Sequence, residues 1–249
     1  PQLLGSPTDI DTTTVAQSSK LPPSPEHPFG TDATGRDQLV RVIYGSRVSL
    51  TVGVIATLIS TGIGLVMGAL AAFYGGWFDT IIMRLADMFL AIPYTLFVIT
   101  MLAVMGQGIQ NVFIAIGVLG WPSIARVFRS AILSVKENDY VDPARAMGAS
   151  DLRIIARHIF PNSVASIVVY ATMNIGGAIL TESALSYLGM GVTPPTPSWG
   201  IMIQDGQTFL QTQPWLMIMP GLAILSTVLA FTLLGDGLRD ALDVKMKDA

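Results

Sequence analysis

The chain carries the sequence KENDYVDPARAMGASDLRIIARHIFPN at residues 136–162, a polar island between two long apolar runs. Asp142 is a good helix N-cap, Pro143 suits the first helical position, and Gly148 can end a short helix. A second helix start follows at Ser150. The pattern therefore predicts two short helices that meet at a glycine corner and form a compact knob outside the membrane.

Five apolar stretches of the chain are long enough to cross about 30 Å of hydrocarbon at a rise of about 1.5 Å per residue. We expect membrane spans at about residues 48–74, 77–105, 109–133, 163–188 and 215–234. Hydrophobic residues make up 51% of the 249 residues and charged residues only 12%, whereas soluble domains carry about a quarter charged residues. The sequence therefore predicts an all-α, polytopic transmembrane helical bundle.

Small residues, a proline and a charge pair predict local structural features within these spans. Trp121-Pro122 should kink the third span. Arg84 and Asp87 lie three residues apart on one helical face, and we expect them to neutralise each other near the interface. Glycines at spacings that let membrane helices approach closely occur in the first span, at Gly53, Gly62, Gly64 and Gly68.

Two polar residues of the fourth predicted span, Asn174 and Glu182, are candidates for the translocation pathway. A carboxylate inside a membrane helix is unfavourable, so it is a functional candidate by default. Two structural alternatives stand beside that hypothesis. Glu182 can lie close to the outer interface, or it can pair across the bundle.

The chain divides by composition into an extracytoplasmic segment at residues 1–47 and a transmembrane domain at residues 48–249. Lys and Arg gather around the knob at 136–162 and at the C-terminus, which places both in the cytoplasm by the positive-inside rule. The loops at 106–108 and 189–214 hold no Lys or Arg and are expected outside. A short helix is expected after a proline-rich stretch within the second of these loops.

Several classes of function are disfavoured by what the sequence lacks. It has no cysteine, and its two histidines, His27 and His158, are far apart, so we expect no metal site. No GxxxxGK[ST] phosphate loop, G-x-S-x-G or H-E-x-x-H pattern occurs. The net charge of −3 argues against nucleic acid as a partner. We therefore expect no catalytic residues in this chain, so any energy for its function must come from another subunit.

The polar knob resembles the EAA loop of the inner-membrane permease subunits of ATP-binding-cassette importers. That loop reads EAA, three residues, G, nine residues, I, one residue, LP. The matching positions here are Asp142, Pro143 and Ala144, then Gly148, then His158, Ile159, Phe160 and Pro161. Asp-Pro replaces Glu-Ala, and histidine stands where isoleucine is commonest. The ending RHIFPN, the stretch HPFGTDATGRDQLVRVIYGSRVSL at residues 27–50 and GMGVTPPTPSWG at 189–200 are similar to the dipeptide and oligopeptide permeases.

This resemblance implies a type I importer permease fold with a further membrane span upstream of Pro1. It implies half of a translocation pathway for di- or oligopeptides in the inner membrane of a bacterial or archaeal cell. The implied partners are a second, similar permease, two ATPase subunits that bind ATP and Mg²⁺, and an external binding protein. The residues implied in coupling to the ATPase are Asp142, Pro143, Ala144, Arg145, Ala146, Met147, Gly148, Ala149, Ser150, Asp151 and Pro161.

Two alternatives stay open from the sequence. A nickel or glutathione importer permease of the same family would look similar at this level. An ion-coupled secondary transporter belongs to another class, and it would predict several intramembrane carboxylates and broken helices in matched repeats. The sequence shows one clear carboxylate of that kind, Glu182, and no internal repeat.

Overall fold

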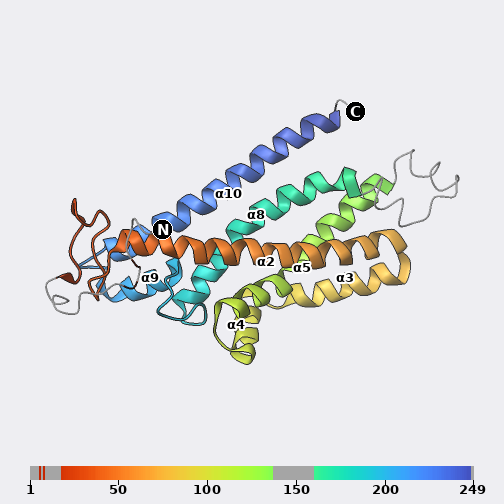
Figure 1. Ribbon diagram of the computed structural model, residues 1–249. Coiled ribbons are helices and arrows are strands. Elements are labelled where there is room, and N and C mark those ends of the chain that lie inside the picture. Colours follow the sequence, from red (N-terminus) through yellow and green to blue (C-terminus); the bar gives the residue numbers. More distant parts are fainter. Residues whose placement is uncertain (1–5, 7, 9–17, 137–159, 248–249) are drawn as a thin grey trace. The chain divides into compact units, whose positions relative to one another are not determined.

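The computed structural model describes residues 6, 8, 18–136 and 160–247, and the long regular elements of these residues are all helices (Figure 1). In chain order they are α2 (Gln38–Tyr74), α3 (Gly76–Ala91), α4 (Tyr94–Met105), α5 (Ile109–Lys136), α8 (Phe160–Tyr187), α9 (Trp199–Gly206), the 3-10 turn η2 (Gln207–Phe209) and α10 (Trp215–Lys247). The predicted all-α class is confirmed.

Four helices of the described chain are long and apolar enough to cross a membrane, and these are α2, α5, α8 and α10. Helices α3 and α4 meet the same criterion only as a pair, and they are bent by 89° at the break between them. If the bent pair counts as one span, the described chain has the five spans that the sequence predicts.

The break between α3 and α4 is a feature that the hydropathy pattern did not predict. It falls at Ile92 and Pro93 within the expected span 77–105. Proline has no N–H for the helix ladder and disfavours helical backbone in the residue before it. Ile92 is accordingly extended, with φ −89° and ψ 132°. By contrast, Pro122 lies inside α5, which continues on both sides of it.

The chain separates into two compact units. The first unit contains residues 1–55, 99–113 and 176–230, and the second contains residues 56–98, 114–175 and 231–249. In the first unit, buried apolar side chains come from α2, α8, α9 and α10, namely Val52, Ile179, Leu185, Met202 and Leu216.

In the second unit, the last part of α2 packs closely against α5 through two of the predicted glycines. A Cβ added at Gly64 would lie 2.6 Å from Cγ2 of Ile124, and one added at Gly68 would lie 2.6 Å from the carbonyl oxygen of Ala125. Neither position has room for a larger residue. The predicted packing role is confirmed for these two glycines, whereas a Cβ at Gly62 would meet nothing within 4 Å.

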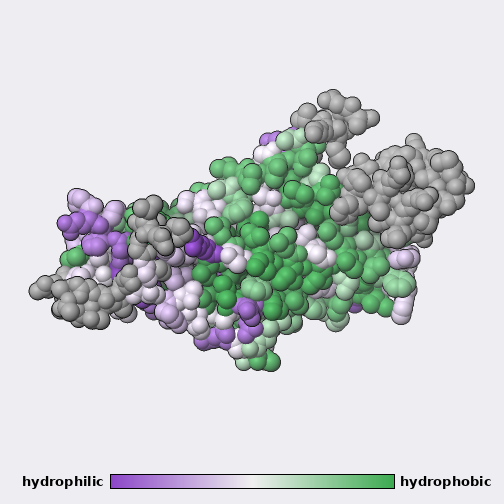
Figure 2. Space-filling view, viewed as in Figure 1, coloured by the Kyte–Doolittle hydropathy of each residue, from purple (hydrophilic) through white to green (hydrophobic). Residues whose placement is uncertain are grey.

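Large apolar side chains are exposed on the spanning helices, where the space-filling view is strongly hydrophobic (Figure 2). Leu58 is 65% exposed and Leu233 is 69% exposed. Extended apolar surface of this kind marks contact with a membrane or with another protein. The outer faces of these helices are therefore suited to lipid, as the composition predicts.

Candidate functional site

The predicted coupling segment joins α5 to α8. The coupling candidates from Asp142 to Asp151 lie outside the described residues. Pro161 is described, and it lies in the first turn of α8, which begins at Phe160. Proline is tolerated there because the first N–H groups of a helix have no partner inside the helix.

Two arginines attach α5 to α3 within the second unit. Arg129 donates two hydrogen bonds to Asp79, from Nε to Oδ1 over 2.5 Å and from Nη2 to Oδ2 over 2.6 Å. Arg126 donates from Nη2 to Oδ1 of Asp87. Paired N–H groups of one guanidinium fix the orientation of a carboxylate as well as its distance. The helix that leads into the coupling segment is therefore joined to α3 by charge pairs.

Asp87 has the partner that the sequence predicts, Arg84, and a second partner that it does not predict. Arg84 lies 3.8 Å from Asp87 and its side chain is 75% exposed. Arg126, from another helix, makes the closer contact with the same carboxylate. The i,i+3 spacing identified the first pair, but no local pattern reveals a partner that is 39 residues away.

Glu182 is fully buried within the first unit, although it lies in a helix apolar enough to span a membrane. The hydroxyl of Ser49 on α2 donates to its Oε2 over 2.8 Å, and the hydroxyl of Ser186 donates to its Oε1 over 2.7 Å. Ser183 is 3.5 Å from Oε2. A buried charged or polar group needs such partners to be tolerated.

Asn174, the other pathway candidate, belongs to the second unit. Its side-chain nitrogen donates to the carbonyl oxygen of Tyr170 over 2.9 Å, within its own helix. The structure therefore places the two pathway candidates in different units, and each has a polar partner of its own.

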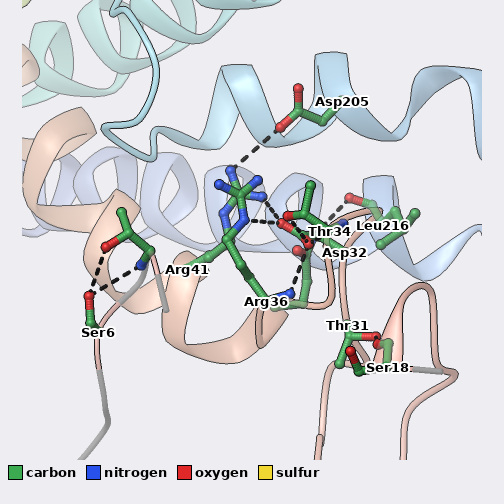
Figure 3. Close-up of polar contacts among 11 residues, drawn as sticks. Ser6, Ser18, Thr31, Asp32, Thr34, Arg36, Arg41, Asp205 and Leu216 are labelled. Atoms are coloured by element: carbon green, nitrogen blue, oxygen red, sulfur yellow. Dashed lines mark hydrogen bonds and ion pairs between the residues drawn. The ribbon is translucent and has the colours of Figure 1, made fainter. Parts of the chain in front are cut away.

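The segment before α2 contains a polar cluster that the sequence analysis missed. Asp32 accepts hydrogen bonds from the backbone N–H of Thr34 at 2.8 Å and of Arg36 at 2.9 Å, and from Nε of Arg36 at 2.6 Å. Nη1 of Arg41 also donates to it (Figure 3). The available signal was Asp32 followed by Thr34 and Gly35, which is typical of a turn held by an aspartate side chain.

The charge balance around Asp32 favours its ionised form. Burial alone would raise the pKa of this carboxyl, but the Arg41 guanidinium, the N–H of Arg36 and the Thr34 hydroxyl outweigh it, and the pKa lies below its usual value. Arg41 is itself buried at 3% exposure. The pair is therefore a fixed structural contact.

Among the residues described, no group of three or more His, Asp or Glu side chains is placed to hold a metal ion.

Residues 63–248 match the family described as "Binding-protein-dependent transport system inner membrane component". The chain belongs to this family. It is therefore a membrane-embedded permease subunit, not a catalyst, and it is a multi-pass component of the inner membrane. A binding-protein-dependent system of the ATP-binding-cassette type has ATPase and binding-protein partners. Family membership confirms the resemblance and excludes the ion-coupled secondary transporter.

Curated relatives match most of the chain. It is 46% identical over 225 residues to the glutathione transport system permease protein GsiD of Pectobacterium atrosepticum. This match covers 90% of this chain and 75% of that protein. It is 45% identical over 225 residues to the dipeptide transport system permease protein DppC of Alkalihalophilus pseudofirmus, covering 90% and 74%.

Solved structures show the same fold at lower sequence identity. An inward-facing structure of the MetNI methionine ABC transporter matches with a TM-score of 0.68 and 18% identity, over 82% of this chain and 97% of that one. An amino acid ABC transporter crystallised with histidines matches with a TM-score of 0.64 and 13% identity, over 81% and 94%. These matches confirm the importer permease fold.

Proposed function

We propose that this chain forms half of the translocation pathway for short peptides in an ATP-driven importer. The observation that carries this proposal is the similarity, over 90% of the chain, to permeases named for dipeptide and glutathione transport. Glutathione is itself a tripeptide, so the two names share one substrate chemistry. A glutathione importer is the second candidate, because identities of 46% and 45% do not separate the two.

The coupling mechanism rests on the loop between α5 and α8. Residues 136–162 dock as a knob in a cleft of the ATPase subunit, which binds ATP and Mg²⁺. When the ATPase subunits close, they move the knob as a lever and swing the pathway between inward-facing and outward-facing states. The pairs Arg129–Asp79 and Arg126–Asp87 support this proposal because they let α3 follow α5.

The assembly contains a second, similar permease, two ATPase subunits and an external binding protein. The coupling loop and the C-terminus face the cytoplasm, where Lys and Arg are concentrated. The segment before α2 and the loop that carries α9 face the other side, where the binding protein docks. Asn174 stays a prediction for the pathway, whereas the buried contacts of Glu182 favour a structural role.

Affinity purification of the chain from membranes in mild detergent, followed by mass spectrometry, tests this assembly. We expect an ATPase with a phosphate loop and a second permease to remain bound. A matched variant in which residues 142–151 are replaced by a Gly/Ser linker should lose the ATPase and keep the second permease. Recovery of the chain alone, together with transport in liposomes without ATP, would contradict the proposal.

A further inference from the structure

Both carboxylate oxygens of Glu182 are occupied by hydroxyl donors from its own chain. Ser49 on α2 binds one oxygen and Ser186 on α8 binds the other. The side chain is 0% exposed before any partner subunit is added. No part of this carboxylate is therefore presented to a molecule that passes along the surface of the first unit.

Ser186 connects this carboxylate to the segment that leads into α9. Its hydroxyl donates to Oε1 of Glu182 over 2.7 Å and accepts a hydrogen bond from the backbone N–H of Val192 over 3.3 Å. Ser186 is 1% exposed, and Ser198, the N-cap of α9, is 0% exposed. One buried hydroxyl therefore links the carboxylate to the loop before the short helix.

The start of α9 is packed tightly against α8 and α2. A Cβ added at Gly200 would lie 2.7 Å from Cβ of Ser186, and one added at Gly45 would lie 3.3 Å from Cδ1 of Trp199. The indole Nε1 of Trp199 also donates to the carbonyl oxygen of Val42 over 3.0 Å. Both glycines thus permit the close approach of α9 to α2 and to Ser186, the partner of Glu182.

The last turn of α9 is attached to α2 by a charge pair. Asp205 reaches toward Arg41, with 3.5 Å between its Oδ2 and Nη2 (Figure 3). Arg41 is held in place by Asp32. The pair is longer and more exposed than the contacts at the first turn, since the Asp205 side chain is 46% exposed. The contacts at Glu182 are therefore the stronger attachment.

We propose that Glu182 is a positioning residue that holds α9 against α2 and α8 through Ser186, and that it does not contact the transported molecule. This role goes beyond the proposed function and chooses between the pathway and pairing hypotheses for this carboxylate. It predicts that loss of the carboxylate releases the buried face of α9 locally.

The absence of cysteine in the chain allows a direct test with a single introduced thiol. Met202 lies on the buried face of α9 and is 1% exposed, so a Met202→Cys thiol in the assembled complex should react slowly with a maleimide. Adding Glu182→Ala should speed labelling about tenfold. This factor corresponds to the loss of one hydrogen bond with a net contribution of about 1.4 kcal/mol. Ser186→Ala should also speed it, and it leaves the Ser49 contact in place.

Two controls make the result specific to α9. Leu102→Cys, at a residue that is 1% exposed on α4, should stay slow in both backgrounds. Asn174→Ala, a polar-to-alanine change elsewhere in α8, should not alter labelling of the Met202→Cys thiol. Glu182→Gln should fall between the parent and Glu182→Ala, because the amide keeps one acceptor oxygen.

Labelling at the parental rate in both Glu182→Ala and Ser186→Ala would overturn the proposal. Faster labelling of the Leu102→Cys thiol would also overturn it, because the whole unit would then have opened. A changed KM for peptide uptake in Glu182→Gln without faster labelling would assign the carboxylate to the pathway instead. The labelling readout needs neither substrate nor ATP, so its failure is distinct from failure of the proposed function.

Discussion

Arg129 and Asp79 form a two-point ion pair, with 2.5 Å from Nε to Oδ1 and 2.6 Å from Nη2 to Oδ2. The pair joins α5 to α3 and is only partly exposed, at 31% and 23% of the two side chains. A double-mutant cycle with Arg129→Ala and Asp79→Ala should give a coupling energy of about 1 kcal/mol in thermal or denaturant unfolding.

Arg84→Ala is the matched control for this cycle. Arg84 lies 3.8 Å from Asp87 and is 75% exposed, so its removal should not change stability measurably. Coupling between Arg129 and Asp79 that cannot be distinguished from zero would remove the argument that α3 follows α5.

The contact between α2 and α5 should be sensitive to one methyl group. Gly68→Ala places a Cβ 2.6 Å from the carbonyl oxygen of Ala125, so the helices must separate. We expect a loss of about 1–3 kcal/mol in unfolding free energy. Gly62→Ala, where a Cβ meets nothing within 4 Å, should be neutral or slightly stabilising. Equal effects of the two changes would contradict the packing role of Gly68.

The cluster before α2 should make stability depend on acid pH. The pKa of Asp32 is lower in the folded chain than in the unfolded one, where a carboxyl of this type titrates at about pH 4. Its stabilisation is therefore fully present above about pH 4 and is lost as the pH falls toward the folded pKa. Asp32→Asn should lower the melting temperature at pH 7 and flatten the fall below pH 4. A variant that keeps the parental difference between pH 7 and pH 3 would contradict this assignment.

Gly148, the predicted corner of the coupling loop, should be required for transport but not for membrane insertion. Gly148→Leu should abolish uptake while the complex keeps its basal ATPase activity, because the knob no longer transmits closure of the ATPase. Gly62→Leu makes the same glycine-to-leucine change in α2, where a Cβ meets nothing within 4 Å, and serves as the control. Normal uptake by Gly148→Leu in proteoliposomes would rule out the lever.

Hydropathy identified the spanning helices better than it identified their ends. α2 begins at Gln38, before the expected start at residue 48, and α10 continues to Lys247, beyond the expected end at 234. An apolar stretch marks the part of a helix that lies in lipid, whereas the hydrogen-bond ladder continues through polar residues. Pro93 carried the signal for the break between α3 and α4, and its neighbour Ile92 is extended.

The hydrogen-bond partners of Glu182 could not be predicted from the sequence. The carboxylate stood out because it interrupts an apolar span, but its partner Ser49 lies 133 residues earlier in the chain. Serines are common and carry no periodic signal, so only the packing of α2 against α8 shows which of them donate. Ser186 lies four residues after Glu182, but the sequence does not show that its hydroxyl binds the carboxylate.

Reconstitution of the chain with its second permease, ATPase subunits and binding protein in proteoliposomes measures the proposed transport itself. We predict that uptake of a labelled dipeptide requires hydrolysable ATP on the side of the vesicle membrane where the ATPase subunits lie. It also requires the binding protein on the opposite side. Competition by unlabelled glutathione would then rank the two candidate substrates. Uptake that continues without ATP, or ATP-driven uptake that no short peptide competes for, would contradict assignment of the chain to a peptide importer.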